Sequence, residues 1–406
     1  MSSNDLSLSK SRATAKVADF IAFVADRETE QVLKRFVLEQ AMPHTHIGLG
    51  GIDEAIAYLE KTERSPQFLI VDLNLSVMPL SDLGRLSQVC EPSVQVVALG
   101  ERNDVGLFRS LLKIGIRDYL VKPLTVELLS KTIDVSQGKI SDVVAARVGK
   151  VICFTGARGG VGVTTLSVNL ARYLADETHR RVAYVDLNLH GGSANSMLAL
   201  KSNNGLFDVL QNVHRLDPQY VERTLVAKNN RLFVLSAELE FQEKIAIPPG
   251  ALAHILHILS DSFHYVLLDI NDPLSVLGEE ALDHAARAYV ITDPTVHGTR
   301  QTVRLLRHIE SRDNNPQTSL VLNHPNAAVA GKVASVDIGA AVGRAVLHEI
   351  RFETKSLAIA ENLGETPKEK GPHGFLQSIK QIANDLTGQR EQAAVSLLQK
   401  FRLRRG

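Results

Sequence analysis

The sequence lacks the features that mark several large classes of protein. It has only two cysteines, Cys90 and Cys153, which excludes a disulfide scaffold and a cysteine-rich zinc or iron–sulfur site within one chain. Its 45 basic and 45 acidic residues cancel, so no net field attracts nucleic acid or an anionic membrane. No apolar run approaches the ~20 residues that cross a bilayer, and the polar N-terminus has no signal-peptide core. We therefore expect a protein of a reducing cytoplasm whose membrane contacts are peripheral.

Short apolar runs alternate with amphipathic stretches twice along the 406 residues. The first set of apolar runs is Phe20–Val24, Phe68–Val71, Val94–Leu99 and Arg117–Val121. The second set is Val151–Thr155, Arg181–Leu187, Arg231–Leu235, Tyr265–Ile270, Ala288–Thr292 and Ser319–Asn323. Strands that alternate with helices predict an α/β fold class, with two doubly wound domains and mostly parallel sheets. The expected organisation is a flexible leader (1–15), a first domain (16–138), a linker (139–149), a second domain (150–388) and a basic tail (389–406).

The most informative stretch is VICFTGARGGVGVTTLSVNLARYLAD, from Val151 to Asp176. An apolar strand runs into four glycines, after which Thr164 and Thr165 open an amphipathic helix. Glycines let the backbone turn its N–H groups inward, and a helix N-terminus favours negative charge, so the loop suits a polyphosphate. A phosphate-binding loop normally follows GxxxxGK[ST], but the lysine position here holds Val163. A glycine-rich turn without a ligand is the alternative.

The arrangement GARGGVGVTT resembles the deviant loop KGGxGK[ST] of the ParA/MinD class. In that class an early lysine reaches across a dimer to the partner's nucleotide, and Arg158 stands at its position. Arginine keeps the charge but not the compact ammonium geometry. The resemblance implies ATP and Mg²⁺ as cofactors. It also implies nucleotide contacts from Arg158, Gly159, Gly160, Val161, Gly162, Val163, Thr164 and Thr165.

Two further strands end in carboxylates that match the same class. Asp186 matches the first acid of its DxD motif, whereas Asn188 stands where a water-orienting aspartate is expected and cannot act as a carboxylate base. Asp269 ends a strand that resembles Walker B, so the resemblance implies Mg²⁺ binding by Thr164, Asp186 and Asp269. No residue is assigned a catalytic role.

Two C-terminal segments resemble the base-binding parts of the ParA/MinD class. Asn323, in SLVLNHP, matches an adenine-contacting asparagine. The segment Glu349–Pro367 resembles IPxDxxxxxAxxxGxP, although Arg351 replaces the proline that would flank the base. Nucleotide contact and ordinary loop packing both remain open for this segment.

The first domain carries the runs FIAFVADRE, FLIVDLNLSVMPLSDLG, VQVVALG and IRDYLVKPL, which resemble a two-component receiver domain. Asp72 matches the phosphoryl acceptor, Lys122 the conserved lysine and Asp26 one acid of the metal-binding pair. Ala25 replaces the other acid, and losing an oxygen ligand weakens Mg²⁺ binding. Gly100 replaces the hydroxyl residue that senses phosphorylation. We expect a receiver-like fold kept as an interaction or dimerisation surface.

Together, the degenerate receiver and the ParA/MinD-like loop resemble the CpaE/TadZ family over residues 16–388. This resemblance implies a scaffold that localises assembly of Flp (tight-adherence) type IV-like pili, at the inner membrane or a cell pole. It implies an ATP-dependent homodimer that recruits a secretion ATPase and an inner-membrane platform, with little or no hydrolysis. An active ATPase and a phosphorylation-controlled response regulator are the alternatives.

The C-terminal residues 390–406 combine apolar and basic side chains at helical spacing. Such a segment is typical of an interfacial helix that binds anionic lipid. A solvated or partner-docked terminal helix is the alternative. The balanced net charge argues against DNA partitioning as the function.

Overall fold

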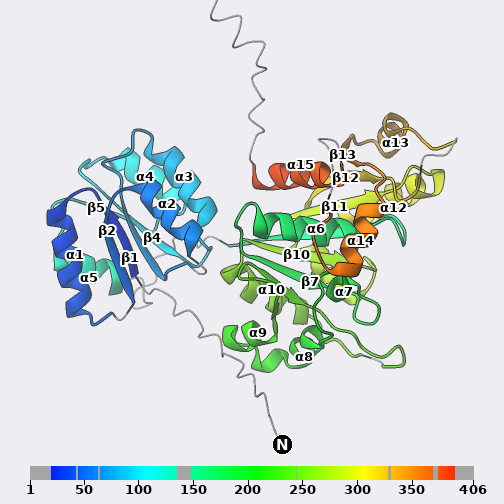
Figure 1. Cartoon of the computed structure of the whole chain (residues 1–406), viewed down its shortest axis with the longest axis horizontal. Helices are drawn as coiled ribbons and strands as arrows, with labels where there is room; N and C mark the ends of the chain where they lie inside the picture. Colours follow the sequence, from blue (N-terminus) through cyan, green and yellow to red (C-terminus); the bar gives the residue numbers. More distant parts are fainter. Residues whose placement is uncertain are drawn as a thin grey trace, which may run out of the picture. The chain divides into compact units, whose positions relative to one another are not determined.

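Buried apolar strands form the centre of each of the two units into which the chain divides, Met1–Arg147 and Val148–Gly406 (Figure 1). The computed structural model describes residues 20–42, 44–62, 65–134, 148–243, 245–327, 331–368 and 374–388. The predicted leader (1–15), nearly all of the predicted linker (139–149) and the predicted tail (389–406) lie outside the described residues. In the described part of the chain, no helix has the length and apolar character needed to cross a membrane.

The first unit is a five-stranded parallel sheet with helices on both faces. Its strands are β1 (Phe20–Val24), β2 (Thr45–Leu49), β3 (Phe68–Asp72), β4 (Gln95–Gly100) and β5 (Asp118–Val121), in the order β2-β1-β3-β4-β5. Its helices are α1 (Arg27–Glu39), α2 (Ile52–Lys61), α3 (Pro79–Val89), α4 (Val105–Lys113) and α5 (Val126–Asp134). Helices α1 and α5 pack on one face, and α2, α3 and α4 pack on the other.

The second unit is built on an eight-stranded sheet in which only β8 runs antiparallel to its neighbour. Its strands are β6 (Lys150–Gly156), β7 (Val182–Asp186), β8 (Val226–Ala227), β9 (Leu232–Leu235), β10 (Tyr265–Ile270), β11 (Arg287–Thr292), β12 (Gln317–Asn323) and β13 (Val346–Ile350). They lie in the order β13-β12-β11-β6-β10-β7-β9-β8. The predicted α/β fold class with mostly parallel sheets is confirmed.

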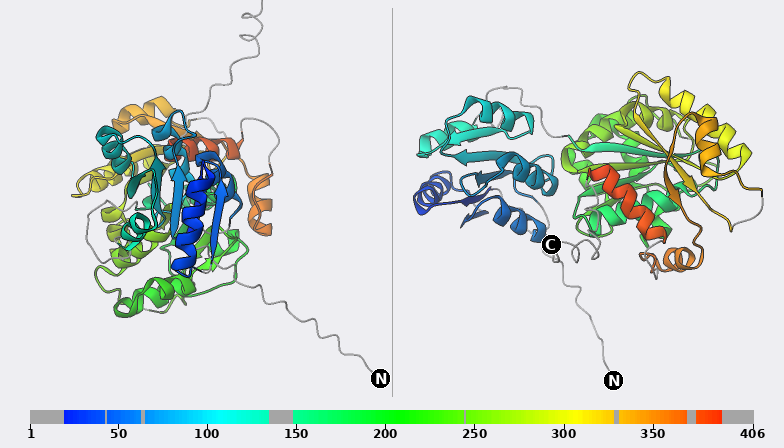
Figure 2. Two further views of the ribbon diagram at one scale, coloured as in Figure 1. Left: turned by 90° about the vertical axis from the view of Figure 1, so that its left-hand side faces the viewer. Right: turned by 90° about the horizontal axis from the view of Figure 1, so that it is seen from above.

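Helices cover both faces of this second sheet. They are α6 (Val163–Asp176), α7 (Ala194–Met197), α8 (Gly205–Gln211), α9 (Pro218–Thr224), α10 (Ala251–Ser262), α11 (Val276–His284), α12 (Val296–Glu310), α13 (Ser335–Val342), α14 (Lys355–Leu363) and α15 (Phe375–Thr387), with a short 3₁₀ turn at Val213–Arg215. Helices α6, α7 and α15 share one core with the sheet, and α8 to α13 share the other. Figure 2 shows α15, in red, lying across the α6 face of the sheet.

Strand β6 lies between β10 and β11 at the centre of the second sheet. The carboxyl ends of parallel strands meet at one edge, so the residues that follow β6, β7, β10, β11 and β12 converge there. In open α/β sheets this edge is where ligands bind. The sequence motifs of the second domain all fall on it.

Candidate functional site

The loop between β6 and α6 has the backbone conformation that its glycines allow. Gly160 and Gly162 have φ angles of +76° and +94°, in the left-handed region, and Gly162 is the N-cap of α6. A Cβ at Gly162 would lie 2.5 Å from the side-chain nitrogen of Asn323, so glycine is also required sterically. The loop therefore wraps tightly around the N-terminus of a 14-residue helix.

The backbone amides of this loop point to a ligand. Within the described residues, none of the N–H groups from Gly159 to Thr165 donates a hydrogen bond to the protein. Gly159 and Gly160 are exposed, and a Cβ at either would meet nothing within 4 Å. Several free amides beside a helix N-terminus form an anion-binding cradle.

The position that holds a lysine in the usual phosphate-binding loop is occupied here by Val163, which packs against the core. Val163 is partly buried against the core on the α6 face of the sheet. Its Cγ2 would lie 2.9 Å from a Cβ at Gly156, the last residue of β6. Nothing at position 163 supplies positive charge to the cradle.

The three residues predicted to hold Mg²⁺ meet at the adjoining strand ends. Asp186 and Asp269 are partners in the register of β7 and β10 and are 2% and 4% exposed. The Thr164 hydroxyl hydrogen-bonds to Asp269, and the Tyr184 hydroxyl donates to Asp269 Oδ2 at 2.9 Å. The fold thus places two carboxylates and one hydroxyl next to the loop between β6 and α6.

These carboxylates are electrostatically unfavourable without a cation. Burial first, and then the neighbouring charge of Asp269, raise the pKa of Asp186 from 3.8 to about 7. Burial also raises the pKa of Asp269, against hydrogen bonds from Thr164 and Tyr184. A divalent cation would relieve this repulsion. Among the described residues no three His, Cys, Asp or Glu side chains form a metal cluster, so Mg²⁺ here would also use the hydroxyl and phosphate oxygens, as it commonly does.

Arg158 is held by a residue of its own chain. Its guanidinium forms an ion pair with Asp293, which follows β11, and Nη1 donates to the Gly159 carbonyl at 3.3 Å. Asp293 is 2% exposed and also accepts a hydrogen bond from the Thr295 hydroxyl at 2.9 Å. Although burial raises the pKa of Asp293, Arg158 and Thr295 lower it overall. The single cation of the loop is therefore engaged in an ion pair.

Asn323 and the Glu349–Pro367 segment both border the loop. The Asn323 side-chain nitrogen donates to the Val161 carbonyl at 2.7 Å, so this residue fixes the loop from the end of β12. A cavity of about 230 Å³ separates α6 from the start of α14, and its lining includes Thr165, Asn169, Glu353 and Thr354. Contacts from Asn323 and Thr165 to a nucleotide stay predictions.

Asn188 closes the loop after β7. Its backbone N–H donates to Asp186 Oδ1 at 3.0 Å, and its side-chain oxygen accepts from the Gly191 N–H at 3.1 Å. Gly192 lets this loop approach, because a Cβ there would lie 2.4 Å from Asp186 Oδ2. The amide is used in loop structure, and it cannot take a proton from water.

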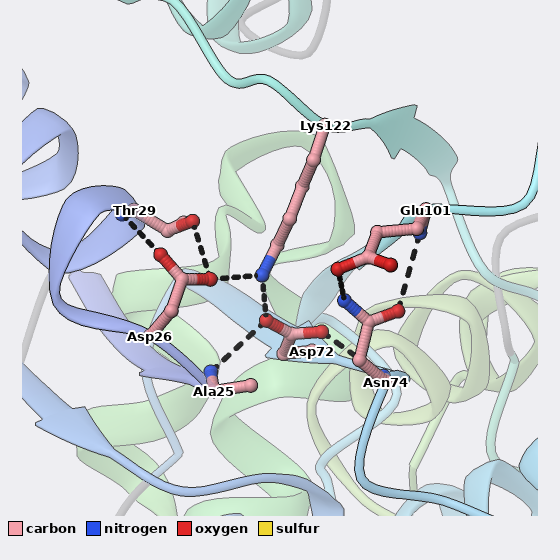
Figure 3. Close-up of polar contacts among 7 residues, drawn as sticks. All are labelled: Ala25, Asp26, Thr29, Asp72, Asn74, Glu101 and Lys122. Carbon is pink, nitrogen blue, oxygen red and sulfur yellow. Dashed lines mark hydrogen bonds and ion pairs between the residues drawn. The ribbon is translucent and has the colours of Figure 1, made fainter.

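The three predicted receiver residues also come together (Figure 3). The Lys122 ammonium bridges the carboxylates of Asp26 and Asp72. Asp72 is fully buried and accepts from the Ala25 and Asn74 backbone N–H groups, each at 3.0 Å. Burial raises the pKa of Asp26, but hydrogen bonds from Lys122 and Thr29 bring it down to about 2. Both oxygens of the matched acceptor are thus engaged by the protein.

At Gly100, where a receiver domain has a serine or threonine, the space for a side chain is occupied by Tyr119 of the neighbouring strand β5. A Cβ at Gly100 would lie 2.4 Å from the Tyr119 hydroxyl. That hydroxyl donates to the Arg102 carbonyl at 2.9 Å, and Tyr119 is 8% exposed. A threonine or serine side chain would not fit at Gly100 while Tyr119 keeps this position.

Residues 149–320 match the family model described as an AAA domain. The septum site-determining protein MinD of Bacillus subtilis is 26% identical over 175 residues, which cover 43% of this chain and 65% of that protein. The chromosome-partitioning ATPase Soj of Thermus thermophilus is 27% identical over 248 residues, 57% of this chain and 94% of that protein. A ParA family ATPase from Chlorobium tepidum superposes with a TM-score of 0.54 at 20% identity, over 59% of this chain and 99% of that one.

These matches support a ParA/MinD-like P-loop ATPase domain in the second unit. These matches agree with the ParA/MinD-like loop and the two strand-end carboxylates that the sequence analysis identified in the second domain. A pilus assembly protein CpaE from Caulobacter crescentus matches 29% of this chain and 92% of that one at 27% identity, with a TM-score of 0.27.

Several residues of the ParA/MinD-like site were not identified from the sequence. They are Asp293, Tyr184, Ser167 and Gly192. Tyr184 hydrogen-bonds to both Ser167 and Asp269, and all three side chains are buried. A tyrosine inside an apolar strand has the same sequence pattern as a core residue, so only the fold reveals its partner. The GG pair at 191–192 was the one local hint, because adjacent glycines permit a close backbone approach.

Proposed function

We propose that this protein is a nucleotide-binding scaffold that localises the assembly of Flp (tight-adherence) type IV-like pili and hydrolyses ATP little or not at all. The observation that carries the nucleotide part is the open amide cradle of Gly159–Thr165 beside the buried Asp186–Asp269 pair. The pilus part rests on the combined resemblance of both domains to the CpaE/TadZ family. In this proposal the protein works in the bacterial cytoplasm, at the inner membrane or a cell pole.

The same residues account for binding without fast turnover. Amides and a cation at Asp186 and Asp269 would hold phosphates and Mg²⁺ in the ground state. Phosphoryl transfer additionally needs positive charge and an oriented water at the γ-phosphate. Val163 supplies no charge, and Asn188 supplies no carboxylate. Losing one such stabilising contact commonly slows a reaction about 100-fold or more.

An exposed apolar face beside the nucleotide site supports the homodimer. Phe241, Leu274 and Val276 are 85%, 67% and 52% exposed. They neighbour a groove of about 520 Å³ whose lining includes Asn188 and Asp272. Large exposed apolar side chains around a groove are typical of a protein interface. A second copy of the chain, brought there by bound ATP, is the proposed occupant.

The first experiment separates binding from turnover. We expect purified full-length protein to bind a fluorescent ATP analogue in the presence of Mg²⁺ and to release phosphate at a rate near the buffer background. Leu274→Asp should abolish ATP-dependent dimerisation in sedimentation while leaving nucleotide binding intact. Phosphate release at rates typical of enzymes would favour the active ATPase instead. Absence of nucleotide binding at millimolar ATP would refute the nucleotide part.

The second experiment tests the pilus role. Deleting the gene in the source organism should remove surface pili, and a fluorescent fusion should mark one site, such as a pole. Co-purification with the pilus secretion ATPase or the inner-membrane platform is expected in the presence of ATP. Normal piliation in the deletion strain would refute this role. Labelling by acetyl phosphate that is lost in Asp72→Asn would favour the response-regulator alternative.

A further inference from the structure

Helix α12 carries a row of arginines on its solvent face. Arg300, Arg304 and Arg307 are exposed and stand at intervals of four and three residues, which places them on one side of an α-helix. We call these three residues the arginine face. The opposite side of α12 packs through Leu305, Leu306 and Ile309 into the core below the sheet.

The arginine face is not neutralised by the protein. Within the described residues, none of its members forms an ion pair, and their one side-chain hydrogen bond joins Arg304 to Gln301 at 3.2 Å. Nearby acids are engaged elsewhere: Glu310 pairs with Arg344 at 2.7 Å, and Asp283 pairs with Arg312. Three adjacent guanidinium groups repel one another by about 0.2–0.5 kcal/mol per pair, and an anionic surface would relieve that repulsion.

We propose that the arginine face of α12 docks an acidic helix of a partner protein. Carboxylates spaced by four and three residues on such a helix would meet the three arginines one to one. The row spans about 10 Å along α12 at 1.5 Å per residue. Arginine binds carboxylates through two parallel hydrogen bonds, which gives a matched row geometric specificity as well as charge.

The surroundings of the row favour a helix over other polyanions. Duplex DNA presents a charge about every 1.7 Å along its axis and binds broad cationic surfaces. Here the arginine row is bordered by α13, which has no basic residue and exposes Asp337. Membrane binding requires a wide apolar face, whereas Val296 is the one large apolar side chain exposed on α12 in the described structure.

The position of α12 links this surface to the nucleotide site. The helix begins at Val296, capped by Thr295, which also hydrogen-bonds to Asp293, the partner of Arg158. The inference deepens the proposed scaffold function, on which it rests for the idea of a recruited partner. The docking chemistry itself stands on the arginine face alone.

The test uses full-length protein and short helical peptides as probes. One fluorescent peptide carries three glutamates at the spacing of the arginine face, and a second has the same composition with the glutamates dispersed around the helix. We expect the first to bind more tightly in an anisotropy titration. The variant Arg300→Glu/Arg304→Glu/Arg307→Glu should weaken it about tenfold or more. A peptide with lysines in place of the glutamates should bind this variant better than the native protein.

A matched control changes the same amount of charge elsewhere. Lys201→Glu/Arg215→Glu/Arg223→Glu alters three exposed cations of the same unit, and this variant should bind the glutamate peptide like the native protein. Equal losses in both variants would overturn the proposal, as would equal binding of the two native-type peptides. Tighter binding of duplex DNA, or of anionic vesicles, that disappears in the arginine-face variant would also overturn it.

Nucleotide binding by the same variants separates this inference from the proposed function. The arginine-face variant should bind the ATP analogue normally, which also shows that it is folded. If no version binds nucleotide while the peptides are still discriminated, the proposed nucleotide function fails and the docking surface stands.

Discussion

Replacing Asp186 by asparagine tests the electrostatics of the candidate cation site most directly. Asp186 is almost completely buried beside Asp269, and its raised pKa means that charging it costs free energy in the folded state. A group whose folded pKa is raised stabilises the protein below its unfolded pKa. That contribution is lost as the pH rises through the folded value. Without a divalent cation, stability should therefore fall between about pH 4 and pH 7.

The size of the effect follows from the same values. A pKa raised from 3.8 to about 7 corresponds to on the order of 4 kcal/mol at pH 8. Asp186→Asn removes the charge and keeps an oxygen that can accept the Asn188 N–H. We expect the variant to be more stable than the native protein at pH 8 in EDTA, by up to that amount. The two proteins should converge near pH 4.

Urea denaturation followed by circular dichroism, at pH 5 and pH 8 in EDTA, measures this difference. Asp26 in the first unit does not mask this change in stability between pH 5 and pH 8. Its pKa of about 2 means that the stability it contributes is lost only at much lower pH. Adding Mg²⁺ with ATP should stabilise the native protein and not the variant. A variant that is less stable than the native protein at pH 8 without Mg²⁺ would refute the reasoning.

Further substitutions test other parts of the two sites. Arg158→Ala should cost about 1–3 kcal/mol of unfolding free energy, because it leaves the buried Asp293 without its cation. Asp293→Asn should cost less than about 1 kcal/mol, because the Arg158 that it leaves behind can be hydrated. Equal shifts of the urea midpoint in the two variants would contradict this asymmetry. Val163→Lys should tighten ATP binding and raise phosphate release about tenfold over the native rate, and an unchanged rate would show that charge at this position is not what limits turnover. Gly100→Thr should destabilise the first unit by about 1–3 kcal/mol through its clash with Tyr119, and Tyr119→Phe in the same chain should recover part of the loss in thermal unfolding.

The sequence predicted the central strands well but missed some of the edge strands. The predicted runs Phe20–Val24 and Tyr265–Ile270 coincide with β1 and β10, which are buried along their whole length. Strands covered on both faces read as continuous apolar runs. The sequence analysis did not mark β2 (THIGL) or β13 (VLHEI), which lie at the edges of their sheets and are largely half-exposed. An edge strand needs no continuous apolar run, so its sequence carries little periodicity.

In the candidate site, too, residues that are close in sequence were predicted, whereas contacts between residues far apart in sequence were not. Gly162 and Thr164 belong to one contiguous loop, so their spacing alone indicated a phosphate cradle. Asp293 lies 135 residues from Arg158, and no local pattern marks it as the partner of a loop cation. Tyr119 beside Gly100 is a comparable case, because only the pairing of β4 with β5 brings them together. Motifs thus reveal which groups are present, and the fold decides which of them are already occupied.

The side chains that already have partners in the protein limit how a bound polyphosphate could be neutralised. With Val163 packed against the core and Arg158 paired with Asp293, the cradle has amides but no uncommitted cation in the described loop. A polyphosphate would therefore obtain most of its charge neutralisation from Mg²⁺ at Asp186 and Asp269, or by drawing Arg158 away from Asp293. In the first case removing Mg²⁺ should abolish nucleotide binding, and Asp293→Asn should change it little. In the second case Asp293→Asn should tighten binding even in EDTA, because the competing carboxylate charge is gone. Because Asp293 leads directly into α12, only the second case would make nucleotide binding alter the start of the helix that carries the arginine face.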